Sequence, residues 1–217
     1  MTDFASRRTM MVDTQVRPAD VTKFPIIDAM LTVPRELFVP LAQREAAYLG
    51  DNLALGGGRV VLDPRTFAKM LDALNVGQDD VVLDIGTGLG YSAAVLARLA
   101  EVVVALEEVP EFARDAGAAL SEVSADNAAI VEGPLSEGAG EHGPYDVILI
   151  QGGIETLPDR VAEQLKDGGR IAALFMEGAL GTCRIGYRLD GSLSWRFAFN
   201  AAAPVLTGFE THATFAL

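Results

Sequence analysis

The stretch that decides the fold is Val81-Val82-Leu83-Asp84-Ile85-Gly86-Thr87-Gly88-Leu89-Gly90-Tyr91. It opens with a continuous apolar run, which is typical of a strand buried on both faces of a parallel sheet. The alternating glycines that follow predict a tight turn in which a ligand can lie against the backbone. An alanine-rich segment, residues 92–100, then predicts a helix. This strand, turn and helix order is the context that a nucleotide-type cofactor loop requires.

The residues after this turn alternate between apolar strand-like and helix-like segments. We expect strands at 102–106, 128–131, 147–150 and 170–175, and helices at 112–123 and 158–165, the last ended by 167–169. Such alternation predicts an α/β fold with a doubly wound, mostly parallel, Rossmann-like sheet. Segments 183–189 and 193–199 flank Asp190-Gly191, a hairpin signal, so we expect the sheet to end in antiparallel strands.

The first third of the chain differs from the rest. Residues 20–47 predict two short helices around Val33-Pro34-Arg35, and residues 56–58, three glycines, predict a flexible loop. Asp63 and Pro64 are a good N-cap and first residue for a helix whose apolar face recurs at helical spacing. We expect one domain over 1–217, with a helical N-terminal cap and substrate loop at 1–62 and a cofactor-binding core at 63–217.

Composition excludes several classes of function. The 217 residues carry a formal net charge of −13, which repels phosphate backbones and argues against nucleic acid as a partner. No apolar run is long enough for a membrane span, and with the single Cys183 this predicts a cytoplasmic location with no membrane partner. His142 and His212 are the only histidines, so we expect neither a metal site nor a histidine-based triad.

Two carboxylates indicate which cofactor the turn binds. The third glycine of a dinucleotide fingerprint is replaced by Tyr91, and the Gly-Lys-Ser/Thr ending of a P-loop is missing. Asp84 would repel a pyrophosphate but attracts the amino group and sulfonium of S-adenosylmethionine. Glu107, at the end of the next expected strand, can accept both ribose hydroxyls. A purely structural turn would account for the glycines, but S-adenosylmethionine accounts for the acids as well.

Motifs along nearly the whole chain resemble those of the protein-L-isoaspartate O-methyltransferase family. The most specific motif is in the cap, where Val33-Pro34-Arg35-Glu36-Leu37-Phe38-Val39-Pro40 matches a segment typical of that family. Five further matches are Ala47-Tyr48 with Asp51, the loop 85–91, the helix 93–97, Pro144-Tyr145-Asp146, and Gln164-Leu165 with Gly168-Gly169-Arg170. It implies transfer of a methyl group to the side-branch carboxylate of isoaspartyl residues, the first step of protein repair. Together with Asp84 and Glu107, it implies a cofactor site made of Gly86, Thr87, Gly88, Gly90 and Tyr91, to which we add Glu132 and Gln151 as candidates from their positions.

The departures from the family pattern fall where the acceptor is expected to bind. The family's Gly-Gln-Thr-Ile-Ser-x-Pro becomes Gly58-Arg59-Val60-Val61-Leu62-Asp63-Pro64, so Val60 and Leu62 replace both hydroxyl side chains. Arg59 is either a carboxylate ligand in their place or a solvated loop charge. None of these three substrate-loop candidates is certain to be catalytic, and an acceptor that is already ionised needs no general base.

Two further departures lie beside the cofactor site. Gly133-Pro134-Leu135 lacks the acid of the family's Gly-Asp-Gly. The adjacent Glu132 either replaces this acid or is a surface charge. Gln151 stands where the family usually has threonine, and it could face cofactor or acceptor. The alternatives are therefore a methyltransferase of the same fold acting on another small-molecule acceptor, such as a small carboxylate, or a catalytically silent S-adenosylmethionine-binding protein. The acceptor, the oligomeric state and the order of the last strands stay open.

Overall fold

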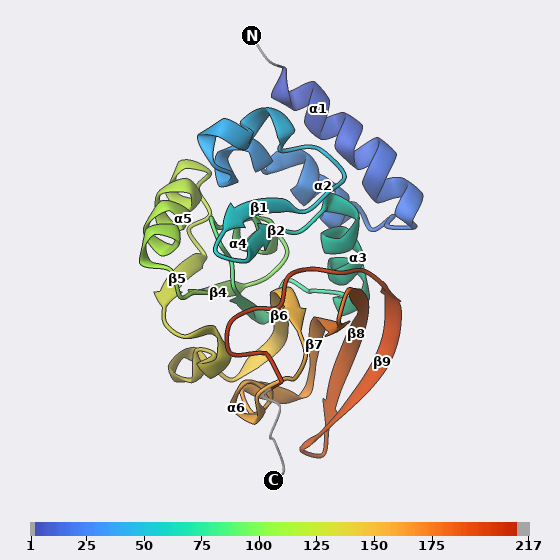
Figure 1. The fold of residues 1–217 in the computed structure, drawn as a ribbon, viewed down its shortest axis with the longest axis vertical. Helices are drawn as coiled ribbons and strands as arrows, with labels where there is room; N and C mark the ends of the chain where they lie inside the picture. Colours follow the sequence, from blue (N-terminus) through green and yellow to red (C-terminus); the bar gives the residue numbers. More distant parts are fainter. Residues whose placement is uncertain (1–2, 212–217) are drawn as a thin grey trace.

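A computed structural model describes residues 3–211, and a seven-stranded sheet in the order β5-β4-β3-β6-β7-β8-β9 forms its centre (Figure 1). His212, one of the histidines considered above, lies outside the described residues. The strands are β3 (Val81–Ile85), β4 (Val102–Glu107), β5 (Ala128–Glu132), β6 (Tyr145–Ile154), β7 (Leu165–Glu177), β8 (Leu180–Leu189) and β9 (Ser192–Asn200).

The sheet is doubly wound about β3. From β3 the chain moves outward to β4 and β5, then returns to the other side for β6 and β7, and all these neighbours pair in parallel. Strands β8 and β9 pair antiparallel, joined at Asp190 and Gly191, which both have positive φ. The predicted fold class is confirmed, including the antiparallel end. The carboxyl ends of β3, β4 and β6 meet at one edge, where ligands bind in open α/β sheets.

Alternate strand residues supply the two faces of the core. On one face, Val82 and Val103 pack under α3 (Pro64–Leu74), α4 (Tyr91–Leu96) and α5 (Pro110–Glu122). On the other, Leu83 and Val104 pack against shorter elements, namely η5 (Leu135–Glu137), η6 (Gly140–His142) and α6 (Asp159–Ala162), and against the chain after β9. No helix within residues 3–211 is long and apolar enough to cross a membrane.

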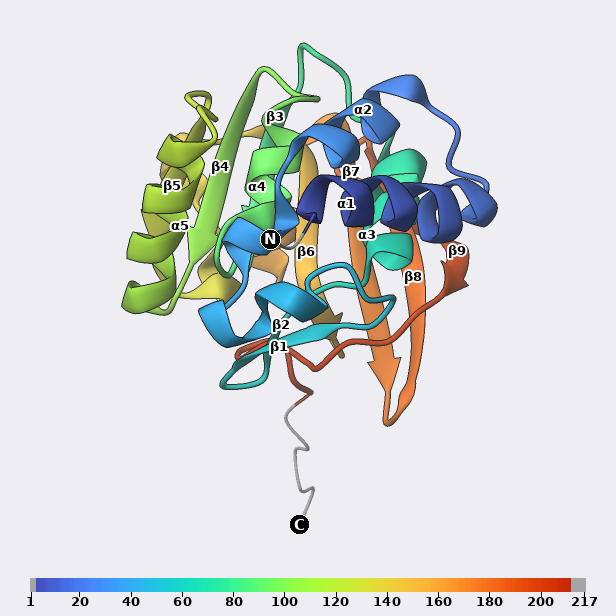
Figure 2. The ribbon, with the colours of Figure 1, turned by 90° about the horizontal axis from the view of Figure 1, so that it is seen from above.

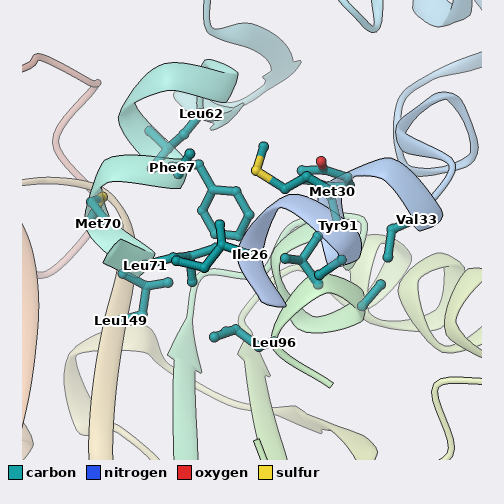
Figure 3. Close-up of a cluster of buried hydrophobic side chains, with 14 of the residues drawn as sticks. Ile26, Met30, Val33, Leu62, Phe67, Met70, Leu71, Tyr91, Leu96 and Leu149 are labelled. Carbon is teal, nitrogen blue, oxygen red and sulfur yellow. The ribbon is translucent and has the colours of Figure 1, made fainter. Parts of the chain in front are cut away.

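The N-terminal cap covers the first of these faces. It consists of α1 (Phe4–Met11), η1 (Val12–Val16), η2 (Arg17–Ala19), α2 (Phe24–Thr32), η3 (Arg35–Phe38), η4 (Leu41–Ala46), β1 (Leu53–Gly56) and β2 (Arg59–Val61). Figure 2 shows α1 and α2 lying over α3 and α4, and α2 contacts both of these core helices. Figure 3 shows Met30 and Ile26 of α2 beside Phe67 and Tyr91 of the core.

The structure corrects the expected helices of the cap and shows which strands its glycine loop connects. Only α2 is an α-helix within 20–47, because Pro34 and Pro40 disfavour helical backbone in the residues before them and leave short 3-10 turns. The three glycines lie at the end of an antiparallel hairpin: Gly56 ends β1, and Gly57 and Gly58 form the turn into β2. All three have positive φ. The predicted N-cap of α3 is confirmed, since the Asp63 carboxylate accepts a hydrogen bond from the Thr66 amide at 2.9 Å.

The helix expected at 158–165 was also too long. Helix α6 ends at Ala162, and Leu165 already pairs with Tyr145 as the first residue of β7. Residues 166–169 then interrupt the β6–β7 register, so the glycines expected to stop a helix form an irregularity inside a strand instead. The glycines do interrupt regular structure, as expected, but pairing with β6 makes the interrupted element a strand and not a helix.

Candidate cofactor and acceptor site

The glycine loop, residues 86–90, leaves the carboxyl end of β3 as predicted. Gly86, Gly88 and Gly90 have φ of +78°, +60° and +94°, a region that favours glycine. The amides of Gly86 and Thr87 both donate to the Leu106 carbonyl, which holds the loop against the end of β4. The loop is therefore fixed beside Glu107, the last residue of that strand.

Asp84 is completely buried beneath the loop. Its carboxylate accepts hydrogen bonds from Ser92 Oγ at 2.5 Å and from Gln151 Nε2 at 2.8 Å. Burial raises the pKa of Asp84 to about 6, against the opposing effect of its hydrogen bonds from Ser92, Gln151 and Thr87. Gln151 therefore faces Asp84 at the carboxyl end of β6, and Ser92 is a site residue that sequence reasoning missed.

Glu107 is the most heavily hydrogen-bonded carboxylate of the site. The backbone amides of Gly88, Glu108 and Val109 donate to it at 2.7, 3.0 and 3.0 Å. The Arg59 guanidinium adds a bidentate pair, with Nη1 to Oε1 at 2.7 Å and Nη2 to Oε2 at 2.8 Å. A carboxylate has about four lone-pair positions, so this set leaves none free.

Arg59 is buried, with only 4% of its surface exposed. The expectation of a solvated loop charge was wrong, because β2 directs this side chain into the site. The alternative expectation was that Arg59 binds the carboxylate of the acceptor in place of the family's hydroxyls. In the structure its carboxylate partner is instead Glu107 of the protein itself. Glu108 Oε1 lies 3.7 Å from Arg59 Nη1, and Arg59 Nε has no hydrogen-bond partner among residues 3–211.

A small cavity brings the substrate loop and the cofactor loop together. Its volume is only about 10 Å³, roughly what one water molecule needs. It is lined by Val60, Val61, Leu62, Phe67, Thr87, Tyr91, Ser92 and Gln151. The two positions that lack the family's hydroxyls, Val60 and Leu62, thus face the side chains of the predicted cofactor site.

Other parts of the chain pack directly on the glycine loop. A Cβ on Gly88 would lie 2.7 Å from Leu55 Cδ1 of the hairpin, and one on Gly86 would lie 3.4 Å from Leu206 Cδ1. Leu206 belongs to the segment after β9, which sequence reasoning did not connect with the site. The contact of Leu206 with the site could not be predicted, because a contact between residues so far apart in the chain leaves no local sequence pattern.

Three further predicted site residues contact parts of the chain outside the glycine loop or lie at the surface. Tyr91 lies under Arg35, whose guanidinium carbon is 4.6 Å from the ring centroid, and its ring packs among core aromatics. Gly90 is close to α5, where a Cβ would lie 3.2 Å from Ala116. Glu132 is exposed at the end of β5, beside Glu107 in the strand register. Within residues 3–211 no cluster of three or more histidine, cysteine, aspartate or glutamate side chains could hold a metal ion.

The sheet is doubly wound, an aspartate precedes the glycine loop after its first central strand, and a glutamate ends the next strand. This combination defines an S-adenosylmethionine-dependent methyltransferase. The family model of protein-L-isoaspartate (D-aspartate) O-methyltransferases matches residues 7–177. The chain belongs to this family.

Individual relatives agree with the family assignment. Protein-L-isoaspartate O-methyltransferase 2 of Pelobacter propionicus is 35% identical over 199 residues, covering 88% of each chain. The enzyme of that name from Syntrophus aciditrophicus is 39% identical over 171 residues, covering 79% of this chain and 78% of its own. A solved protein-L-isoaspartate O-methyltransferase has the same fold, with a TM-score of 0.80 at 24% identity over 93% of this chain and 66% of that chain.

A second solved structure of the same fold carries a ligand. It is a Plasmodium falciparum structure described as a protein-L-isoaspartate O-methyltransferase in complex with S-adenosyl-L-homocysteine, with a TM-score of 0.78 at 17% identity, covering 95% of this chain and 99% of that chain. The residue types here fit such a cofactor: Asp84 and Glu107 are acids at the carboxyl edge, and the glycine loop offers backbone without side chains. The place beside Glu107 is filled by Arg59.

Proposed function

We propose that this chain methylates the free carboxylate of isoaspartyl residues in peptides and proteins, the first step of their repair, in the cytoplasm. The observation that carries the proposal is the cavity in which Val60 and Leu62 of the substrate loop meet Thr87 and Gln151 of the cofactor site. The names of the relatives support the same acceptor. We further propose that cap and core, residues 1–62 and 63–217, work as one domain, because the site takes residues from both.

We assign separate roles to the site residues. The charge of Asp84 attracts the amino group and sulfonium of S-adenosylmethionine, and Glu107 receives its ribose hydroxyls. The backbone of Gly86, Thr87 and Gly88 lies along the cofactor, with Gln151 bordering the reacting end and Glu132 the adenine end. The positions of Tyr91 and Gly90 support a shaping role for them, since both pack against neighbouring helices.

The chain's own residues need only align and desolvate the reactants. When bound, S-adenosylmethionine would supply a methyl group on a positively charged sulfur, which makes that methyl group transferable to a carboxylate oxygen. The acceptor carboxylate is ionised at neutral pH, so no residue has to remove a proton. The apolar side chains of Val60, Leu62 and Phe67 exclude water from the reacting atoms.

The test is methyl transfer to a pair of synthetic peptides. One peptide contains an isoaspartyl residue and its control contains a normal aspartyl residue at the same position. We expect a base-labile methyl ester on the isoaspartyl peptide alone. No transfer to that peptide by a preparation that binds S-adenosylhomocysteine would contradict the proposed acceptor.

A second candidate is a methyltransferase of the same fold that acts on a small apolar carboxylic acid. It is favoured by one observation: the positions of the family's threonine and serine are Val60 and Leu62, so the acceptor side of the cavity is apolar. An acceptor screen with short and aromatic carboxylic acids separates the two. Turnover on such acids, without turnover on isoaspartyl peptides, would replace the first candidate by the second.

A further inference from the structure

We propose that Arg59 occupies the position of the cofactor's ribose on Glu107, and that it moves to Glu108 when the cofactor binds. The inference rests on the proposed function, because it concerns the same cofactor site. It makes Arg59 a positioning residue that couples the β1–β2 hairpin to the state of the cofactor site.

The competition follows from the hydrogen bonds of Glu107. The amides of Gly88, Glu108 and Val109 come from the backbone of the loop and the strand end, and they stay when a ligand binds. Among the described residues, 3–211, Arg59 is the one side chain that donates to this carboxylate, and it comes from a segment 48 residues away along the chain. Two ribose hydroxyls need the same two carboxylate oxygens, so they bind only after the guanidinium has left.

Glu108 gives the displaced guanidinium a partner close by. Its carboxylate is 3.7 Å from Arg59 Nη1, and its side chain is 24% exposed, whereas that of Glu107 is completely buried. Burial raises the pKa of Glu108, Arg59 opposes that rise, and Glu107 and Glu210 add to it. Glu108 is therefore an acid that benefits from a closer cation, and a buried arginine that keeps a carboxylate partner avoids the cost of an unpaired charge.

The hairpin that carries Arg59 can change position at its turn. A Cβ at Gly56, Gly57 or Gly58 would meet nothing within 4 Å, so this end of the hairpin is unpacked. The unpartnered Nε of Arg59 shows that its present position satisfies the guanidinium incompletely. Leu55 of the same hairpin lies on Gly88, so opening of the hairpin also uncovers the glycine loop.

The experiment is a calorimetric titration with S-adenosylhomocysteine. We expect Arg59→Gln to bind at least ten-fold more tightly than the wild type, because Glu107 is then free for the ribose. Arg65→Gln is the matched control, since Arg65 is an exposed arginine at the start of α3, and it should bind like the wild type. Equal affinity of Arg59→Gln and wild type would overturn the inference.

Substitution of Glu108 tests the second position of the guanidinium. Glu108→Gln should weaken binding several-fold in the wild type but leave it unchanged in the Arg59→Gln background. Equal weakening in both backgrounds would show that Glu108 does not receive Arg59. If Arg59→Gln folds poorly, Glu108→Gln is compared with the wild type alone, since the partly exposed Glu108 can be replaced without loss of the fold. Unchanged affinity of Glu108→Gln would then contradict the inference. Arg59→Lys, which keeps a cation but loses the bidentate fork, should then raise the affinity by a smaller factor.

The same titrations separate this inference from the proposed function. Equal and tight binding by wild type and Arg59→Gln would remove only the competition, leaving the methyltransferase assignment in place. Failure of every variant to bind would overturn both. Methyl transfer to isoaspartyl peptides without any gain in affinity for Arg59→Gln would support the proposed function and refute the role of Arg59.

Discussion

Arg59 of the β1–β2 hairpin and Glu107 at the end of β4 form a buried bidentate ion pair, 2.7 and 2.8 Å between the paired atoms. The pair ties the N-terminal cap to the carboxyl edge of the sheet. A buried ion pair adds little net stability, but removal of one partner leaves a charge that is costly to bury. The two residues should therefore respond differently to substitution.

Glu107→Gln should lower the free energy of unfolding by about 3–5 kcal/mol, because it removes the bidentate partner of the buried Arg59 guanidinium and leaves only the more distant carboxylate of Glu108, at 3.7 Å. Arg59→Gln should cost less, about 1–3 kcal/mol, because three backbone amides still donate to Glu107. Urea unfolding measures both values. Arg114→Gln, which removes an exposed pair with Asp115, is the control and should change stability by less than about 1 kcal/mol. Equal losses for Glu107→Gln and Arg114→Gln would contradict the burial argument.

The stability contributed by Asp84 should depend on pH. Its pKa is about 6 in the fold and near 3.8 in the unfolded chain, so between these values the folded state holds the extra proton. Stability is therefore lost as pH rises through this window, by about 3 kcal/mol in total. The difference between wild type and Asp84→Asn, measured by urea unfolding from pH 4 to 7, should follow this fall. A difference that grows in favour of the wild type with pH would show that the carboxylate is stabilised by its surroundings.

Val60→Thr should improve methylation of an isoaspartyl peptide. The substitution keeps the shape of the side chain and returns a hydroxyl to the acceptor side of the cavity. One hydrogen bond to the acceptor carboxylate contributes about 0.5–1.5 kcal/mol, which lowers KM by roughly 2- to 12-fold. Val76→Thr, beyond the far end of α3, is the control for the added hydroxyl. If KM is unchanged for Val60→Thr, position 60 does not contact the acceptor.

Tyr91→Phe should leave the affinity for S-adenosylhomocysteine unchanged. The Tyr91 hydroxyl is buried and has no hydrogen-bond partner in the described part of the chain, and the ring packs against Phe38 and Phe67. Loss of an unpaired buried hydroxyl is neutral or stabilises by up to about 1 kcal/mol, since phenylalanine keeps the face that contacts Arg35. Calorimetry measures the affinity for S-adenosylhomocysteine, and thermal unfolding measures the stability. A large loss of affinity would restore Tyr91 to the cofactor contacts predicted from the sequence.

Much of the core could be predicted from local patterns. The apolar runs of β3, β4 and β6, the N-cap at Asp63 and the hairpin turn at Asp190 are each encoded within a few neighbouring residues. The elements that were missed depend on distant partners. The β1–β2 hairpin is too short to show a strand pattern, and the start of β7 is fixed by its pairing with Tyr145.

The sequence by itself determined the class of fold and the kinds of group at the site. Asp84, the glycine loop and Glu107 follow from residue types placed at strand ends, because parallel strands bring their carboxyl ends to one edge. Only the tertiary structure decided what these groups contact. Arg59 could be a solvated charge or a carboxylate ligand until folding placed it on Glu107, 48 residues away, where both side chains are buried. Such a contact has no local signature, since it depends on where a hairpin of the cap lies against the sheet.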